Sequence, residues 1–375
     1  MSKGSVVIKL LVFIIALVFI GIVNQFLLAH KEFQIVKKGL IETEIIIGTN
    51  KMELLEKSLQ QALAYSYYQS SYEVAKNGGY EQTASTWRKY DDISKFPDFK
   101  EALTKKLLSI FNLYATDLKQ DDDLKRYGTI VGNYQSGKIV KEGDKLENVS
   151  VSSDTKLEIS TGIYRLVNEP KIFVQIPIRV LTLFDMGKSE FVDKDSVGSA
   201  IQSAESSLPT TCKRVSTPDF CETPHYSCES FYPATCQSQF ESGIKTQISA
   251  LQSSNGIKKE LDTKETKIAH VSSGPFGTPS GKCCVSGHNE CSEVCTGEGE
   301  AKECHEECSF VCDVFGTQYV NAFCEFKNYA SARVEIKITD TTNKYPVYEG
   351  NVDMRNIQLN FNVISGNDYS QKLIQ

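Results

Sequence analysis

The apolar segment Val6–Ala29 constrains this chain more than any other feature. From Leu10 to Val23 every residue except Gly21 is apolar. As an α-helix rising about 1.5 Å per residue, the segment is about 36 Å long, against a bilayer hydrocarbon core of about 30 Å. Lys9 lies near one end, where its side chain can reach the lipid headgroups. The segment therefore predicts one transmembrane helix that ties the protein to a lipid bilayer.

The charges beside this helix predict its orientation in the membrane, and the residues at its C-terminal end predict whether it is cleaved. Lys3 and Lys9 favour a cytoplasmic N-terminus, although Lys31, Lys37 and Lys38 follow on the other side. A cleaved signal peptide would have a shorter apolar region, about 7–15 residues, ending in small residues at the cleavage site. Leu27-Leu28-Ala29 is a poor site of that kind. We therefore expect a retained signal anchor, with residues 1–5 as a cytoplasmic tail and the bulk of the chain extracytoplasmic.

Cysteine usage supports an extracytoplasmic location independently of the lysines. All twelve cysteines lie within one region. An even number, confined to one part of a chain with an export segment, indicates disulfides formed in an oxidising compartment. The disulfide candidates are Cys212, Cys221, Cys228, Cys236, Cys283, Cys284, Cys291, Cys295, Cys304, Cys308, Cys312 and Cys324. The first four could close on one another, but sequence does not fix the connectivity.

The later cysteines have a regular spacing that suggests a pairing. Cys291 and Cys295 are four residues apart, as are Cys304 and Cys308, so each pair would share one face of a helix. Two antiparallel helices would then pair Cys295 with Cys304 and Cys291 with Cys308. We therefore predict a disulfide-rich helical hairpin. One turn further along, Cys312 would need Cys283 or Cys284, and Cys324 would take one of the remaining cysteines.

A zinc site is the alternative for this cysteine region, because His288 and His305 lie among the thiols. No Cys-x2-Cys occurs, which is the spacing common to zinc knuckles and dithiol redox enzymes. We therefore expect disulfides, with no metal and no cofactor. Seven glutamates make the predicted hairpin acidic and could attract a cationic partner or calcium, although a solvated helix face explains them as well: Glu290, Glu293, Glu298, Glu300, Glu303, Glu306 and Glu307.

The rest of the chain predicts an α+β fold. Apolar residues recur at threes and fours over 51–76 and again over 98–119, which indicates two helices. Gly48-Thr49-Asn50 is expected to separate the first of these from the membrane helix, and Asn77-Gly78-Gly79 to end it. A short helix is expected near Val197–Ala204. Trp87, the only tryptophan, is interpreted as a core residue.

Alternating residues predict two β-hairpins. The first covers 157–180, with a turn at Asn168-Glu169-Pro170, and the second pairs 330–338 with 357–363. We expect both in one antiparallel sheet, with the two helices on its apolar face. The expected division of the chain is a transmembrane helix at 6–29, a helical layer at 30–127, a β-domain at 128–204 and 325–375, and a cysteine-rich insertion at 205–324.

Two resemblances support placement of the chain at a cell surface. Lys3-Gly4-Ser5 before the apolar helix resembles the leader of type IV pilins, which a peptidase cuts after the glycine; that family normally has Glu where this chain has Lys9. Leu59-Gln60-Gln61-Ala62, Gly78-Gly79-Tyr80 and Ile338-Thr339-Asp340 through Lys344-Tyr345-Pro346-Val347-Tyr348 resemble single-span archaeal surface proteins without an assigned activity. These resemblances imply a filament subunit and a surface location, respectively.

Motifs for catalysis are missing from the sequence. None of the five histidines belongs to H-E-x-x-H, and no G-x-S-x-G occurs. The mild net charge of −6 argues against a nucleic-acid partner. Asn148 begins a glycosylation sequon. We expect no enzyme but a membrane-anchored structural or recognition protein, with a protein or surface glycan as its partner. A pilin-like filament subunit is the alternative, and a surface hydrolase is a third.

Overall fold

A computed structural model describes residues 3–81, 86–94, 96–126, 128–161, 164–222, 227–251, 256–296 and 303–367. Side chains are described from Ile15 onward, except those of residues 295, 296, 303 and 304. The chain folds into two compact units. The first contains Met1–Glu73, Lys100–Arg179 and Tyr345–Arg355, and the second contains Val74–Phe99, Val180–Lys344 and Asn356–Gln375. The predicted α+β class, with an apolar N-terminal helix and antiparallel sheets, is confirmed.

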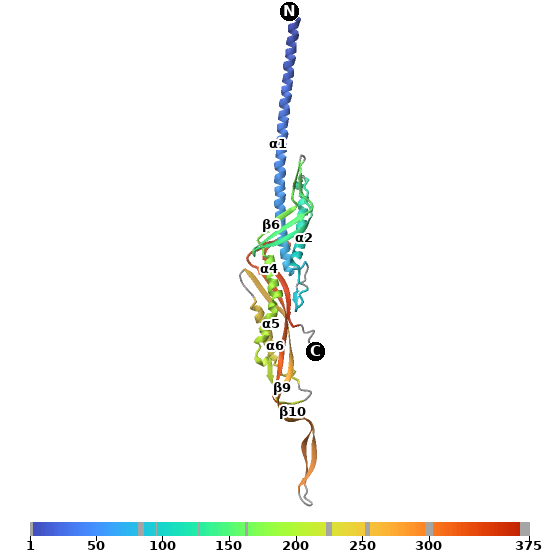
Figure 1. Ribbon diagram of the computed structural model, residues 1–375, viewed down its shortest axis with the longest axis vertical. Helices are drawn as coiled ribbons and strands as arrows, with labels where there is room; N and C mark the ends of the chain where they lie inside the picture. Colours follow the sequence, from blue (N-terminus) through green and yellow to red (C-terminus); the bar gives the residue numbers. More distant parts are fainter. Residues whose placement is uncertain are drawn as a thin grey trace. The chain divides into compact units, whose positions relative to one another are not determined.

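The first helix, α1 (Lys3–Lys76), is continuous (Figure 1), so the break predicted at Gly48 is wrong. Gly48 is buried within the helix, and a Cβ there would lie 2.7 Å from the Tyr164 hydroxyl. Its lack of a side chain admits a close neighbour, which offsets its weak helix propensity. The predicted end of the helix is confirmed, because Gly78 and Gly79 have positive φ and their amides donate to the carbonyls of Ala75 and Val74.

In the first unit, two helices cover one face of a three-stranded sheet. The helices are α1 and α2 (Phe99–Gln120), the second of which was predicted, and the strands are ordered β2-β3-β6. Asn112 on α2 binds the backbone of Tyr134 on β2 through both ends of its amide, at 2.8 and 2.9 Å. The remaining elements are the short helix α3 (Asp122–Lys125) and the pairs β4-β5 and β11-β12. The strand bounds are β2 Tyr134–Glu142, β3 Leu146–Ser153, β4 Leu157–Ser160, β5 Arg165–Asn168, β6 Lys171–Ile176, β11 Tyr345–Tyr348 and β12 Val352–Arg355.

The expected pairing of residues 157–180 is wrong. The strand β4 pairs with β5, whereas β6 pairs with β3, so the alternating segments belong to two different sheets. The strand pattern also ends at Ile176, because Val180 begins α4 (Val180–Gly187). Alternation identifies a strand and its buried face, but it does not identify the partner strand.

The second unit is built on a six-stranded sheet, separate from the sheet of the first unit. Its order is β1-β13-β10-β7, and β8 and β9 also pair with β10. The predicted pairing of 330–338 with 357–363 is confirmed, as Ile336 lies opposite Phe361, but the expectation that both hairpins share one sheet is wrong. The strand bounds are β1 Thr86–Lys89, β7 Arg214–Ser216, β8 Phe220–Cys221, β9 Ile257–Thr296, β10 Glu303–Asp340 and β13 Gln358–Gly366.

Helices cover the apolar face of this sheet. They are α4, the π-helix η1 (Lys188–Asp193), α5 (Ser196–Ser207), which was predicted, and α6 (Ala234–Ser249); two single turns, η2 (Thr210–Cys212) and η3 (Glu229–Phe231), lie between α5 and α6. Trp87 is fully buried, stacks on Phe361 with ring centroids 3.6 Å apart, and donates from Nε1 to the Gly78 carbonyl at 2.7 Å. The interpretation of Trp87 as a core residue is therefore confirmed.

Candidate recognition surfaces

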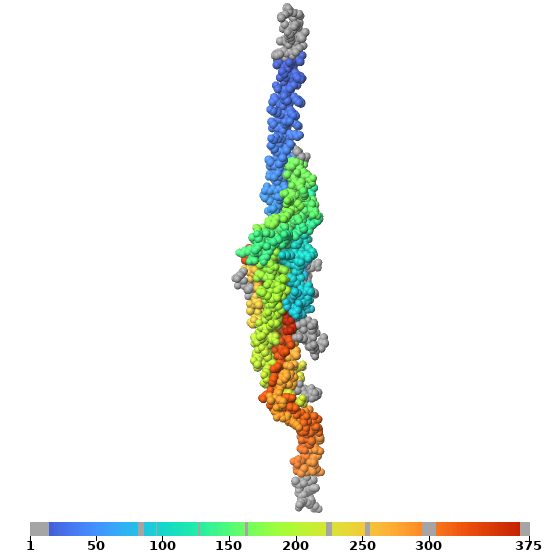
Figure 2. Space-filling model, in the orientation of Figure 1, coloured from blue at the N-terminus to red at the C-terminus, as the bar shows by residue number. Residues whose placement is uncertain are grey.

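The strands β9 and β10 continue beyond the sheet as a two-stranded extension of the second unit. Residues 282–296 pair only with residues 303–317 there, because β8, the last other strand on β10, pairs with Gln318 and Tyr319. We call residues 282–296 and 303–317 the ribbon. Figures 1 and 2 show it as the narrow orange part of the second unit. Most of its described side chains are exposed.

Disulfides cross-link the ribbon and fix its base. Cys291 is bonded to Cys308 and Cys284 to Cys312, with Cα atoms 3.9 and 5.6 Å apart. Cys283 is bonded to Cys221, which ties the base of the ribbon to β8. The backbone register also places Cys304 opposite Cys295, but their side chains lie outside the described part of the structure. A two-stranded ribbon alone is marginally stable in water, so these cross-links are what hold it in one conformation.

The predicted helical hairpin at this position is wrong, although its pairing of Cys291 with Cys308 is present. Residues four apart share one face of a helix, and they also share one face of a strand, because four is a multiple of the strand period of two. Two antiparallel strands around a central turn therefore bring the same cysteines together as two antiparallel helices. The spacing therefore predicts which cysteines face each other, but it does not distinguish helices from strands.

The first four cysteines do not close on one another as expected. Cys212 is bonded to Cys236 within the group, but Cys228 is bonded to Cys324 and Cys221 to Cys283, both outside it. The physical reason is that β7 and β8 add to β10 on the sheet edge, which places this segment beside the strands that carry the later cysteines. Sequence spacing contains no signal for such pairing.

Large apolar side chains are exposed on the ribbon. Phe310, Val314 and Phe315 are 63, 51 and 64% exposed. The Phe310 ring lies over Gly287, where a Cβ would be 2.7 Å from its Cζ atom. Between Cys283 and Phe315 the sequence has eight Asp and Glu residues and one Lys, although the net charge of the whole chain is only −6. The ribbon thus combines exposed aromatic groups with a locally acidic stretch of chain.

The structure offers little to a metal ion in this region. Among the described residues, one group with ligand geometry occurs here, formed by Cys291, Glu306 and Cys308. Its two sulfurs are bonded to each other and are therefore not thiolate ligands. Of the two expected histidine ligands, His288 pairs with Asp313 at 2.9 Å and lies opposite Val311, whereas His305 lies opposite Val294. The residues singled out for zinc are thus not brought together.

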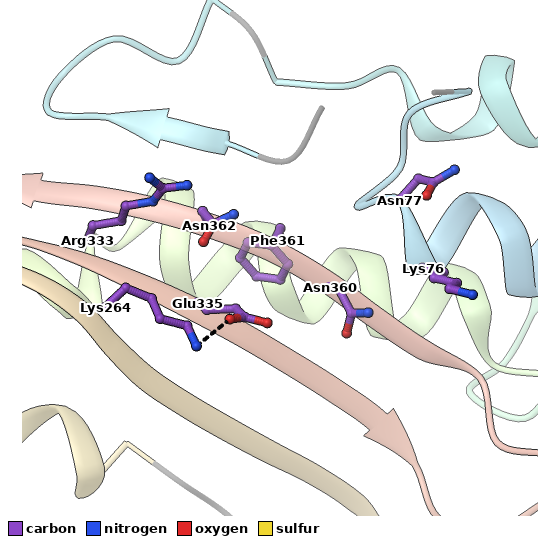
Figure 3. A pocket seen from close by; sticks show the side chains of 8 residues that line it. All are labelled: Lys76, Asn77, Lys264, Arg333, Glu335, Asn360, Phe361 and Asn362. Carbon is purple, nitrogen blue, oxygen red and sulfur yellow. Dashed lines mark ion pairs between the residues drawn. The ribbon is translucent and has the colours of Figure 1, made fainter. Parts of the chain in front are cut away.

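A second surface feature is a polar cavity of about 570 Å³ in the second unit. It lies on the polar face of the six-stranded sheet, at the C-terminal end of α1 (Figure 3). Figure 3 shows Arg333 beside Asn362, with Asn77 and Lys76 at the opposite end of the cavity. The lining residues are Lys76, Asn77, Lys264, Arg333, Glu335, Asn360, Phe361 and Asn362.

Ion pairs neutralise the one carboxylate in this lining. Glu335 lies 2.9 Å from Lys264 and 3.3 Å from Lys337. The hydrogen bond from Lys264 is the main reason that the pKa of Glu335 is below its usual value. Arg333, in contrast, is exposed and has no hydrogen bond or ion pair with any described residue. The cavity therefore has an excess of positive charge.

Sequence reasoning did not find this cavity. In the sequence, Arg333, Glu335 and Lys337 are simply the polar positions of an alternating strand, as are Asn360 and Asn362. Alternation places them on one face, but the wall formed by Lys76 and Asn77 comes from the end of α1, far away in sequence. No local pattern indicates that contribution.

The sequon asparagine, Asn148, lies in β3, the central strand of the three-stranded sheet, and is half-buried. Its Nδ2 atom, which would carry a glycan, donates to Glu142 at 2.7 Å. Glycosylation at Asn148 remains a prediction, and in the folded state it would require this contact to break.

No protein-family model, no curated protein and no solved structure matches this chain. Over its described residues, α1 is the one helix long and apolar enough to cross a membrane, and its apolar part is not buried by the fold. Together with the disulfides, this helix is compatible with a membrane-anchored extracellular protein.

Proposed function

We propose that the protein is a single-pass membrane protein that performs a structural or recognition role at the cell surface. Its N-terminus would be cytoplasmic, Val6–Ala29 would lie in the bilayer, and the disulfide-bonded bulk would be outside. One observation carries the role: the cross-linked ribbon exposes Phe310, Val314 and Phe315 in a fixed conformation. Exposed apolar groups held rigidly bind a partner with a small loss of conformational entropy.

A catalytic role is not part of the proposal. The described lining of the polar cavity contains no Ser, Cys or His that could act as a nucleophile or as its imidazole base.

Two measurements test the proposal. Membrane-impermeant amine labelling of intact cells should modify lysines of the two units, and alkylation before reduction should find no reactive thiol. A photo-reactive residue at position 310 should form a specific cross-link on intact cells, while one at position 173, outside the ribbon, should not. Phe310 and Phe173 are both exposed, at 63 and 50%. Reactive thiols with protected lysines, or equal cross-linking at both positions, would contradict it.

A filament subunit is a second candidate, and a specific observation favours it. Beyond Val6–Ala29, α1 exposes Phe33, Val36, Leu40 and Ile47, which share one helix face at 65, 66, 54 and 38% exposure. An apolar stripe outside the bilayer suits packing against the same helix of another copy. N-terminal sequencing discriminates: a mature chain that begins at Ser5 supports a processed filament subunit, and an intact leader supports the anchored protein.

A further inference from the structure

The polar cavity of the second unit has a composition that points to a ligand class. We propose that it binds a saccharide unit bearing a carboxylate. This inference is independent of the ribbon and of the proposed role at the cell surface, because the cavity is built entirely from residues of the second unit.

The charges in the cavity favour an anionic group. Lys76, Lys264 and Arg333 contribute three cations. Lys264 pairs with the single lining carboxylate, Glu335, and with Asp262 outside the lining, and Glu335 also pairs with Lys337. The guanidinium of Arg333 is the group available to a ligand, since no described residue pairs with it. A planar guanidinium binds a carboxylate through two parallel hydrogen bonds.

The rest of the lining suits hydroxyl groups. Asn77, Asn360 and Asn362 present amides, each of which both donates and accepts hydrogen bonds, as a sugar hydroxyl requires. Asn360 accepts from Gln358 at 2.6 Å, which leaves its amino group for a ligand, and the Asn77 amide has no side-chain hydrogen bond within the described residues. An inorganic anion offers the amide oxygens no hydrogen-bond donor, whereas a sugar hydroxyl can both donate and accept.

The end of α1 orients such a ligand. The C-terminal end of a helix carries partial negative charge, which disfavours an anion near Lys76 and Asn77. The carboxylate would therefore lie at the Arg333 end of the cavity and the hydroxyls would reach toward Asn77, as the arrangement in Figure 3 allows. A volume of about 570 Å³ lies within the range of about 300–1,000 Å³ typical of small-molecule sites, so the cavity is large enough for a short saccharide.

The experiment uses the full chain in detergent micelles, with glucuronate as the probe and glucose and inorganic sulfate as comparisons. Dissociation constants are measured by calorimetry and ligand-observed NMR for the unaltered protein, Arg333→Gln and Lys327→Gln. Lys327 is an exposed cation on the same strand β10, outside the cavity, so its loss matches the charge change. Loss of the paired contact in Arg333→Gln should weaken glucuronate binding about 10- to 100-fold.

Glucose should bind at least about tenfold more weakly than glucuronate, because it lacks the charge-assisted contact. Lys327→Gln should bind glucuronate like the unaltered protein, and all three proteins should share one melting temperature, since both cations are exposed. Three results would overturn the assignment: no glucuronate binding, an equal loss of affinity in Lys327→Gln, or sulfate binding as tight as that of glucuronate.

Discussion

Tyr134 shows how one buried hydroxyl affects stability. Its side chain is buried, its ring packs edge-on against Phe111 with centroids 4.8 Å apart, and its hydroxyl has no hydrogen-bond partner among the described residues. Removing an unsatisfied buried hydroxyl relieves a desolvation cost. We therefore expect Tyr134→Phe to leave the free energy of unfolding at pH 7 unchanged or to raise it by up to about 1 kcal/mol, as measured by denaturant unfolding.

The pH dependence of Tyr134→Phe follows from the same burial, which raises the pKa of Tyr134 to about 12 from an ordinary value of 10.0. Below pH 10 the phenol is neutral in both the folded and unfolded states. Between about pH 10 and 12 it ionises first in the unfolded state, so the unaltered protein loses stability that Tyr134→Phe retains. Parallel stability curves for the two proteins over this range would contradict the prediction.

Tyr67→Phe is the contrasting substitution. Tyr67 is fully buried and donates its hydroxyl to the buried carboxylate of Glu147. Its replacement takes this donor away from a buried acid, so we expect a loss of about 1–3 kcal/mol at pH 7. Equal effects of Tyr67→Phe and Tyr134→Phe in denaturant unfolding would show that the hydroxyl partner does not decide the outcome.

At the scale of elements, sequence periodicity located strands and helices better than it located their partners. The helices at α2 and α5 and the pairing of β10 with β13 were predictable because each has one apolar stripe or face. The length of β9 and β10 was not predictable, because the ribbon is polar at most positions and lacks a buried face. Gly48 suggested the end of a helix, but it lies inside one, where its lack of a side chain allows a close contact with Tyr164.

The disulfides of the second unit lie either in the ribbon or in the body of the unit. We therefore expect their removal to affect local and global stability separately. Cys284–Cys312 lies in the exposed ribbon, whereas Cys212 and Cys236 are each 1% exposed in the body of the unit. Replacing Cys284 and Cys312 with Ser should loosen the ribbon alone, and hydrogen exchange should accelerate at residues 282–296 and 303–317 while the global unfolding midpoint stays nearly constant.

The matched control is Cys212→Ala with Cys236→Ala. This pair lies in the packed core, so its loss should lower the global stability by about 2–4 kcal/mol and leave ribbon exchange unchanged. A global loss of the same size from the ribbon pair would show that the ribbon and the body of the second unit unfold together.

For the whole molecule, the sequence predicts the class of fold but not the division of the chain into two units. The sequence patterns predict a disulfide-bonded α+β protein with an apolar N-terminal helix, as observed, but the expected single sheet is two sheets in two units, each assembled from three separated stretches of chain. Such assembly depends on contacts between distant residues, which periodicity does not contain. The cavity was missed for the same reason, since its wall joins the end of α1 to β10 and β13.

The proposed membrane anchor leads to a prediction with a closely matched control. Phe19 and Phe33 lie on the same helix and are 66 and 65% exposed, but only Phe19 lies within Val6–Ala29. A lysine at the centre of a membrane helix costs about 2.5–3.5 kcal/mol, and Lys9 already opposes insertion. Phe19→Lys should therefore shift the protein from the membrane fraction to the soluble fraction and leave its cysteines reactive, because the chain would stay in a reducing compartment.

Phe33→Lys should remain in the membrane with its disulfides formed. Equal fractionation of the two variants would show that the helix is not held by the bilayer at the predicted segment.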